Sequence, residues 1–138
     1  LEAAHLLDGG RVRAARRAAY VIEAIRAAGI ETRIEVTSFL WPAVVEAKRL
    51  APDLTVGFLT PEFDEDIIQR CVRRGFEQVC PHVDTLTEDL VAAAHAAGLV
   101  VRAYGISRRE QVDRLIATGA DGATVNWPDW IMEHPTPP

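Results

Sequence analysis

Short apolar runs alternate along the chain with longer amphipathic stretches, and this alternation predicts strands and helices in turn. The expected strands are 33–38, 54–59, 76–80, 99–104 and 123–126. Their first residues are about 21 to 24 positions apart, which is the length of one strand plus one crossover helix. The chain is therefore expected to be an α/β protein built on a parallel sheet.

The stretches between the strands have helical periodicity. The first expected helix has its apolar positions at Val12, Ala15, Ala19, Ile22 and Ile25. A turn at 8–10 should precede it, and Gly29 should end it. Further helices are expected at about 42–50 and 64–74. Two more should each begin at a capping box, one formed by Thr85 and Glu88 and the other by Ser107 and Glu110. These two helices should end at Gly98 and Gly119 respectively. Right-handed crossovers leave two architectures, a doubly wound sheet or a (β/α) barrel, and no Gly-x-Gly-x-x-Gly turn favours a dinucleotide-binding sheet.

Composition narrows the classes of function. The 138 residues are 49% hydrophobic and 25% charged, as in one ordinary globular domain. The net charge of -5 argues against binding to nucleic acid, and the basic cluster at 11–17 has the spacing of a solvated helix face. No apolar run approaches the roughly 20 residues that span a bilayer. Cys71 and Cys80 read as buried apolar residues, which slightly favours a cytoplasmic compartment. The chain begins with Leu1 and not with Met, so we expect its natural start to be missing, and localisation stays open.

Several segments carry a family resemblance through their order. ETRIEVTSF is similar to a strand ending in Ser-Phe, and APDLTVGFLT to the strand that follows it. CPHVDTLTEDLVAAAHAAGLVVRAYGIS and GADGATVNWPD complete the series. In this order they resemble the C-terminal part of a glycerophosphodiester phosphodiesterase domain, which is a (β/α)8 TIM-type barrel. We therefore expect residues 1–132 to form a partial barrel domain of this kind, followed by a flexible Pro-rich tail at 133–138.

The resemblance also implies a chemistry for the complete protein. Members hydrolyse glycerophosphodiesters to glycerol 3-phosphate and an alcohol, using a divalent metal, Mg or Ca. The family's two histidine motifs and most of its metal-binding carboxylates lie upstream and have no counterpart here, so no catalytic residue is assigned to this chain. Glu2 matches the metal-binding Glu of the family's Glu-x-Lys strand, although Ala4 stands where the family has lysine. The alternative is that Glu2 is a solvated residue on a frayed terminus.

Three aromatic residues are the candidates for substrate contact. Tyr104 stands where the family has a tryptophan at a strand end, near the barrel mouth where active sites lie. Phe39 and Trp41 follow the Ser-Phe turn and are candidates for the same mouth. Packing of the barrel core or of the loop is the alternative for each. His82 is expected at the surface or behind the site, and Glu35, a charge within a strand, needs a basic partner or solvent.

Two other functions stay open at this stage. A degenerate half-barrel without catalysis would act as a binding or self-associating module, because a partial barrel exposes sheet edges and an apolar interior. A different (β/α) barrel enzyme would hold phosphate on backbone amides near the last strands.

Overall fold

Five parallel strands form one curved sheet whose spatial order follows the chain. The computed structural model describes residues 2–129, with side chains from residue 9 onward. The strands are β1 (Glu35–Ser38), β2 (Thr55–Thr60), β3 (Gln78–Pro81), β4 (Val100–Ala103) and β5 (Gly122–Ala123), in the order β1-β2-β3-β4-β5. Val36 pairs with Val56, Phe58 with Val79, and Val79 with Val101. This unbroken order is that of a barrel wall, because a doubly wound sheet reverses its order at a switch point.

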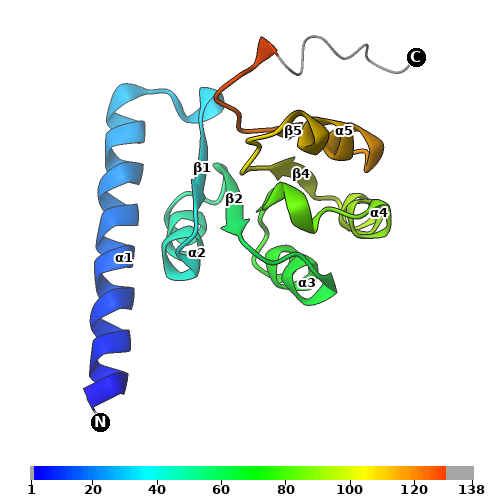
Figure 1. Ribbon diagram of the computed structural model, residues 1–138. Helices are drawn as coiled ribbons and strands as arrows, with labels where there is room; N and C mark the ends of the chain where they lie inside the picture. The colour runs from blue at the N-terminus through cyan, green and yellow to red at the C-terminus, as the bar shows by residue number, and fades with distance from the viewer. Residues whose placement is uncertain (1, 130–138) are drawn as a thin grey trace.

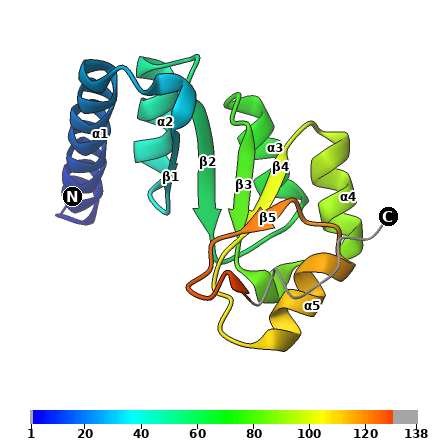
Figure 2. The same ribbon diagram turned by 90° about the horizontal axis from the view of Figure 1, so that it is seen from above.

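The helices lie on the outer side of this arc. They are α1 (Glu2–Ala28), α2 (Trp41–Leu50), α3 (Glu65–Arg73), α4 (Glu88–Ala96) and α5 (Arg109–Ala117), with short 3-10 turns at Glu31–Arg33 and Val83–Thr85. Figures 1 and 2 show α2 to α5 following the outside of the sheet, while α1 stands at its β1 end beside α2. The expected parallel α/β arc is confirmed.

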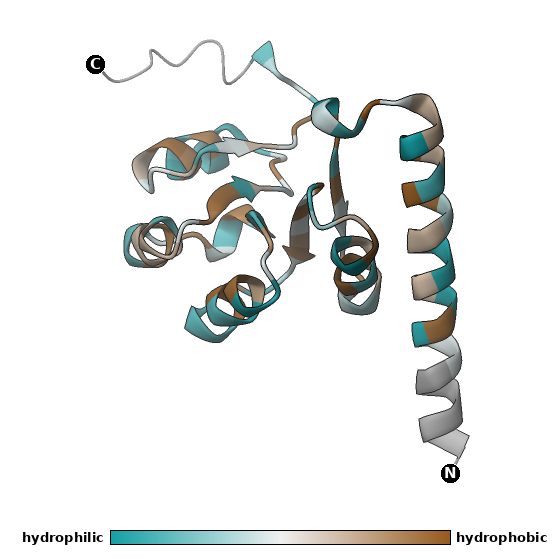
Figure 3. Cartoon of the chain, turned by 180° about the vertical axis from the view of Figure 1, so that it is seen from behind, coloured by the Kyte–Doolittle hydropathy of each residue, from teal (hydrophilic) through white to brown (hydrophobic). Residues whose placement is uncertain are grey.

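Apolar side chains between sheet and helices hold the two layers together. Val56, Val79 and Val101 on neighbouring strands are fully buried, and Val44, Val91 and Val112 meet them from the helices. In Figure 3 the central strands are correspondingly coloured as hydrophobic. Burying each of these side chains contributes about 1.5–3 kcal/mol, so the helical layer and the sheet stabilise each other.

The inner face of the arc is more polar than the outer face. A Cβ on Gly57 of β2 would meet Gln78, Cys80 and Thr37, which places these side chains on one face. Across that face Arg102 Nη1 of β4 donates to Glu35 Oε2 of β1 at 2.9 Å, and both side chains are 41% exposed. The partner that Glu35 required is therefore Arg102.

Several local expectations are wrong. Helix α1 runs through Gly9 and Gly10, where a turn was expected, since a glycine costs a helix interior only about 1 kcal/mol. Its buried face is Ala14, Ala18, Ile22 and Ile25, whereas Val12 is 52% exposed. The reason is that α1 packs along α2, and small alanines allow that close approach.

The expected caps and the last strand also differ. Thr87, not Thr85, caps α4 by accepting from Leu90 N, and the Thr85 hydroxyl donates to the carbonyl of His82 instead. At the start of α5, the side-chain oxygen of Gln111, not of Glu110, accepts from the backbone N–H groups of Ser107 and Arg108. Strand β5 spans Gly122–Ala123 rather than 123–126, although Thr124 N still donates to Ala103 O.

Within residues 2–129 no helix is long and apolar enough to cross a membrane. The expected tail at 133–138 lies outside the described residues.

Candidate functional site

The carboxyl ends of the strands bring aromatic and polar side chains to one rim of the arc. Phe39 follows β1, His82 follows β3 and Tyr104 follows β4. We call these three residues the mouth cluster. Parallel strands place their carboxyl ends at the same edge, and (β/α) barrels bind substrates there.

The rings of the mouth cluster meet edge to face. Phe39 and Tyr104 have ring centroids 5.0 Å apart at 88°, and His82 and Tyr104 have centroids 5.2 Å apart at 89°. Backbone bonds hold the arrangement, since Tyr104 N donates to Pro81 O at 3.0 Å and Val83 N donates to Tyr104 O at 2.9 Å. Phe39 is 53% exposed, whereas partial burial raises the pKa of the Tyr104 phenol. The cluster is thus a fixed wall with one solvent-facing aromatic surface.

His82 is oriented by its own turn and by a glycine. Asp84 N donates to Nδ1 of His82 at 3.2 Å, so the neutral ring carries its proton on Nε2. Gly105 has φ +83, and a Cβ there would lie 2.3 Å from Nε2 of His82. Only glycine therefore allows this imidazole to pack against the chain after β4.

A polar network joins the cluster to α5. Gln111 Nε2 donates to Asp84 Oδ1 at 2.9 Å, while Gln111 Oε1 accepts from the backbone N–H groups of Ser107 and Arg108. The hydrogen bond from Gln111 is the main cause that lowers the pKa of Asp84, and the nearby charges of Arg108 and Arg114 lower it further. The amide groups at the start of α5 are already occupied by Gln111. This arrangement gives no support there to a site that holds phosphate on backbone amides.

Trp41 does not lie with the other two predicted substrate contacts. Its ring packs against Phe58 and Phe76 at centroid distances of 4.9 and 5.3 Å, and the guanidinium of Arg70 stacks over it. These neighbours belong to the layer between the sheet and α3. The geometry therefore favours the packing alternative for Trp41.

The predicted metal ligand cannot be judged from its side chain. Glu2 is the first residue of α1, and its side chain lies outside the described ones. Among the residues with described side chains, no three His, Cys, Asp or Glu residues come together as a metal site. The described residues thus do not fit a divalent cation by themselves, and the metal role of Glu2 stays a prediction.

Comparison with known proteins settles the family. The model of the glycerophosphoryl diester phosphodiesterase family matches residues 10–130. The chain belongs to this family. A glycerophosphodiester phosphodiesterase of Caldanaerobacter subterraneus subsp. tengcongensis is 23% identical over 112 residues, covering 81% of this chain and 46% of that protein. The chain thus spans about half the length of the curated relatives it matches.

Solved structures agree with the family on the fold. A candidate glycerophosphoryl diester phosphodiesterase from Silicibacter pomeroyi DSS-3 is 29% identical with a TM-score of 0.78, over 87% of this chain and 43% of that one. An Oleispira antarctica phosphodiesterase, solved with its product sn-glycerol-3-phosphate, is 23% identical with a TM-score of 0.65, over 72% of this chain and 40% of its own. The arc is therefore part of a (β/α) barrel of this family.

Sequence reasoning did not assign Asp84, Arg108 or Gln111 to the site. Gln111 has a usable signal, because a Gln three residues after the residue that precedes a helix can cap that helix. The sequence pattern also allowed a capping box between Ser107 and Glu110, and that pair was the one predicted. Asp84 has no such signal, since its partner lies 27 residues away.

Proposed function

We propose that this chain supplies the substrate-binding wall of a phosphoric diester hydrolase, which in the complete protein converts glycerophosphodiesters to glycerol 3-phosphate and an alcohol. The observation that carries this proposal is the mouth cluster, where Phe39 and Tyr104 present aromatic surface at the rim on which the fold binds substrates. Family membership supports the reaction class, and the product complex of the Oleispira relative supports the substrate class.

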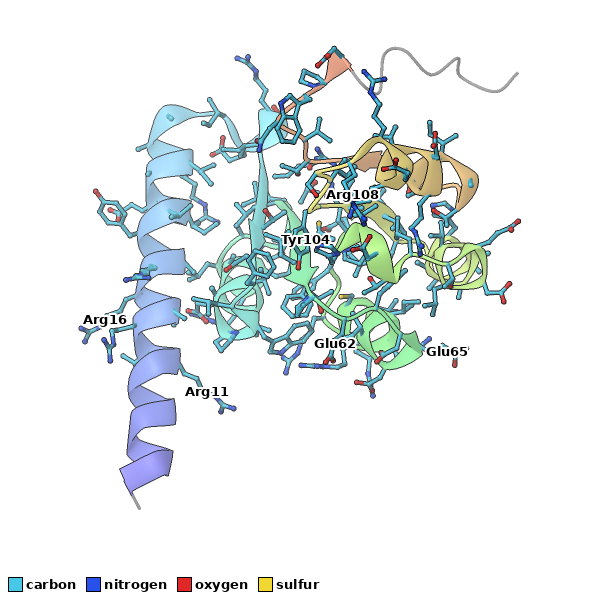
Figure 4. All side chains as sticks on the ribbon, in the orientation of Figure 1. Arg11, Arg16, Glu62, Glu65, Tyr104 and Arg108 are labelled. Atoms are coloured by element: carbon cyan, nitrogen blue, oxygen red, sulfur yellow. The ribbon has the colours of Figure 1, made fainter. Side chains whose placement is uncertain are left out.

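The roles follow from the chemistry of each side chain. The faces of Phe39 and Tyr104 would pack against the C–H edges of the glycerol or of the alcohol group. Arg108, 64% exposed and 3.9 Å from Asp84, would offer a guanidinium to the substrate phosphate at the same rim (Figure 4). His82 would hold Tyr104 in place through their ring contact. The residues with described side chains include no metal site, so a divalent cation, Mg or Ca, would need ligands beyond them, with Glu2 as the candidate from this chain.

The test is an assay of the complete protein with its natural N-terminus. We expect metal-dependent release of glycerol 3-phosphate from at least one glycerophosphodiester. Tyr104→Ala should raise KM about tenfold with a smaller change in kcat, because the lost packing acts on bound substrate. Trp41→Phe is the matched control and should leave KM unchanged, since its ring contacts lie in the helical layer. Failure of the complete protein to release glycerol 3-phosphate from substrates with several head groups would refute the proposal.

A second candidate, a non-catalytic module that self-associates, rests on a different surface. An apolar groove of about 440 Å³ lies between α1 and β1, lined by residues that include Tyr20, Val21, Ile25, Ile34 and Val36. Among the described strands, β1 pairs with β2 alone. A free strand edge beside an apolar groove favours association with another strand-bearing chain.

A further inference from the structure

Three arginines and a tryptophan form a hollow on the outer layer of the arc, away from the mouth cluster. Trp41 comes from the first turn of α2, Arg70 and Arg73 from the last turns of α3, and Arg74 from the residue that follows α3. Together they line a space of about 390 Å³, which we call the arginine hollow. This volume lies within the range of small-ligand sites, about 300–1,000 Å³.

Arg70 lies over the face of the Trp41 ring inside the hollow. Its guanidinium carbon lies 4.4 Å from the centroid of the Trp41 ring, and that ring is itself wedged between Phe58 and Phe76. A guanidinium stacked on an aromatic face keeps its N–H donors in the plane of the group, free to point sideways. Less side-chain freedom is then lost when those donors bind an anion.

The positive charge of the hollow is not neutralised within the described part of the chain. None of the ion pairs formed there involves Arg70, Arg73 or Arg74. By contrast, the neighbouring cations of α2 are paired, Lys48 with Glu77 and Arg49 with Glu46. Arg73 donates to the backbone carbonyl of Gln69 at 3.3 Å, and that acceptor carries no charge.

The position of the arginines near a helix end does not account for this arrangement. Basic residues in the last turn of α3 complement its dipole, and that effect alone explains arginines pointing into solvent. It does not explain why they converge with Trp41, a residue of another helix, on one hollow in a chain of net charge -5. The first turn of α2 also carries no acidic residue.

We propose that the arginine hollow binds a phosphate group. Guanidinium groups match phosphate oxygens with paired N–H donors, and three of them around one hollow suit a compact, multiply charged oxyanion. The phosphate could come from a free phosphate or from the head group of a lipid, and the chemistry of recognition is the same for both. This site is separate from the mouth cluster and does not depend on the proposed hydrolysis.

The experiment titrates the 138-residue chain with inorganic phosphate at constant ionic strength, followed by calorimetry and by tryptophan fluorescence. We expect saturable binding that changes the emission of Trp41, and loss of that signal in Trp41→Phe. Arg73→Gln and Arg74→Gln, both at exposed positions, should each weaken binding about tenfold. Arg16→Gln removes the same charge from α1, where the side chain projects away from the sheet, and should leave binding unchanged (Figure 4).

A second arm uses vesicles of phosphatidylcholine with and without phosphatidic acid. Binding to the acidic vesicles that Arg74→Gln weakens and Arg16→Gln does not, without binding of free phosphate, assigns the hollow to a lipid head group. Saturable binding of free phosphate with the same mutant pattern assigns it to a soluble phosphate. Absence of binding in both arms, or equal weakening by Arg16→Gln and Arg74→Gln, overturns the proposal. Circular dichroism of each variant confirms that the comparison is between folded chains.

Discussion

At the scale of single residues, backbone conformation and burial restrict which side chains a position accepts. Gly105 combines a positive φ with direct contact to the His82 ring. The two cysteines are buried on different elements, Cys71 on α3 and Cys80 on β3. Each of these features can be changed alone and measured.

Gly105→Ala should destabilise the fold more than Gly98→Ala. Both glycines have positive φ, +83 and +85, so both substitutions strain the backbone by about 1–2 kcal/mol. Only at 105 would the new Cβ collide with the His82 ring, whereas nothing lies within 4 Å of it at 98. Urea denaturation of both variants measures the difference. Adding His82→Ala should recover part of the loss at 105 and none at 98, and equal losses at the two positions would contradict the role given to His82.

Neither cysteine should react in the folded chain at pH 8. Burial raises the pKa of the Cys71 thiol to about 12 and that of the Cys80 thiol to about 11, so the reactive thiolate is scarce as well as shielded. Labelling with a thiol reagent should be slow without urea and should reach both cysteines above the unfolding transition. Fast labelling of one thiol under native conditions would show that its element opens locally.

At the scale of elements, long-range polar contacts fix how helices and strands begin. The side chain of Gln111 accepts from the backbone N–H of Ser107 just before α5 and donates to Asp84, which follows β3. Asp121, just before β5, accepts from Val101 N of β4 at 2.8 Å and lies 2.7 Å from Nε2 of His95 on α4. Each residue thereby ties together elements that are distant in sequence.

Gln111→Ala should lower the free energy of unfolding by about 1–2 kcal/mol. The substitution removes a helix cap and leaves Asp84 without its amide donor, and Gln111 itself is buried. Glu110→Ala is the matched control at an exposed position of the same first turn, and it should change stability by less than about 0.5 kcal/mol. Thermal and urea unfolding of both variants decide between them. A larger loss of stability in Glu110→Ala than in Gln111→Ala would instead support the Ser107/Glu110 capping box expected from the sequence.

Asp121→Asn should reduce stability at neutral pH and much less in acid. Burial acts to raise the pKa of Asp121, but the Val101 N–H and His95 outweigh it, so the pKa is lowered on folding. A lowered pKa gives stability that is complete above the unfolded value, about 3.9, and is lost as the pH falls through the folded value. Unfolding curves recorded from pH 7 downward should therefore converge for the two proteins as the pH falls through the folded value. A difference that is independent of pH would mean that the charge of Asp121 plays no part.

At the scale of the whole molecule, the arc exposes features that a closed barrel covers. Glu35 and Arg102 bond across its inner face and join β1 to β4, over 67 positions of the sequence. Beside β1, the apolar groove along α1 leaves Val21 43% exposed. If the chain self-associates, the apolar groove is the surface that we expect to be buried between the copies.

If the groove mediates self-association, Val21→Glu should abolish it without unfolding the chain. A charge at this exposed position of α1 opposes burial of the groove, whereas Val72→Glu, an exposed valine on α3, should leave association unchanged. Light scattering over a range of concentrations measures the oligomer. A discrete dimer that dissociates only with Val21→Glu supports the module, while a wild-type monomer at every concentration refutes it.

The sequence by itself determined the order of elements and the parallel sheet, because apolar periodicity and glycine positions are local signals. The order of its motif-like segments carried the resemblance to the family. The sequence also indicated Phe39 and Tyr104, whose rings the structure brings together, and it grouped Trp41 with them only because it follows two residues later. The tertiary structure decided that Trp41 packs with Phe58, Phe76 and Arg70, that Glu35 pairs with Arg102, and that Gln111 reaches Asp84. These contacts join residues 17 to 67 positions apart, as from Trp41 to Phe58 and from Glu35 to Arg102. Their formation depends on how strands curve and helices pack, and no local pattern records that.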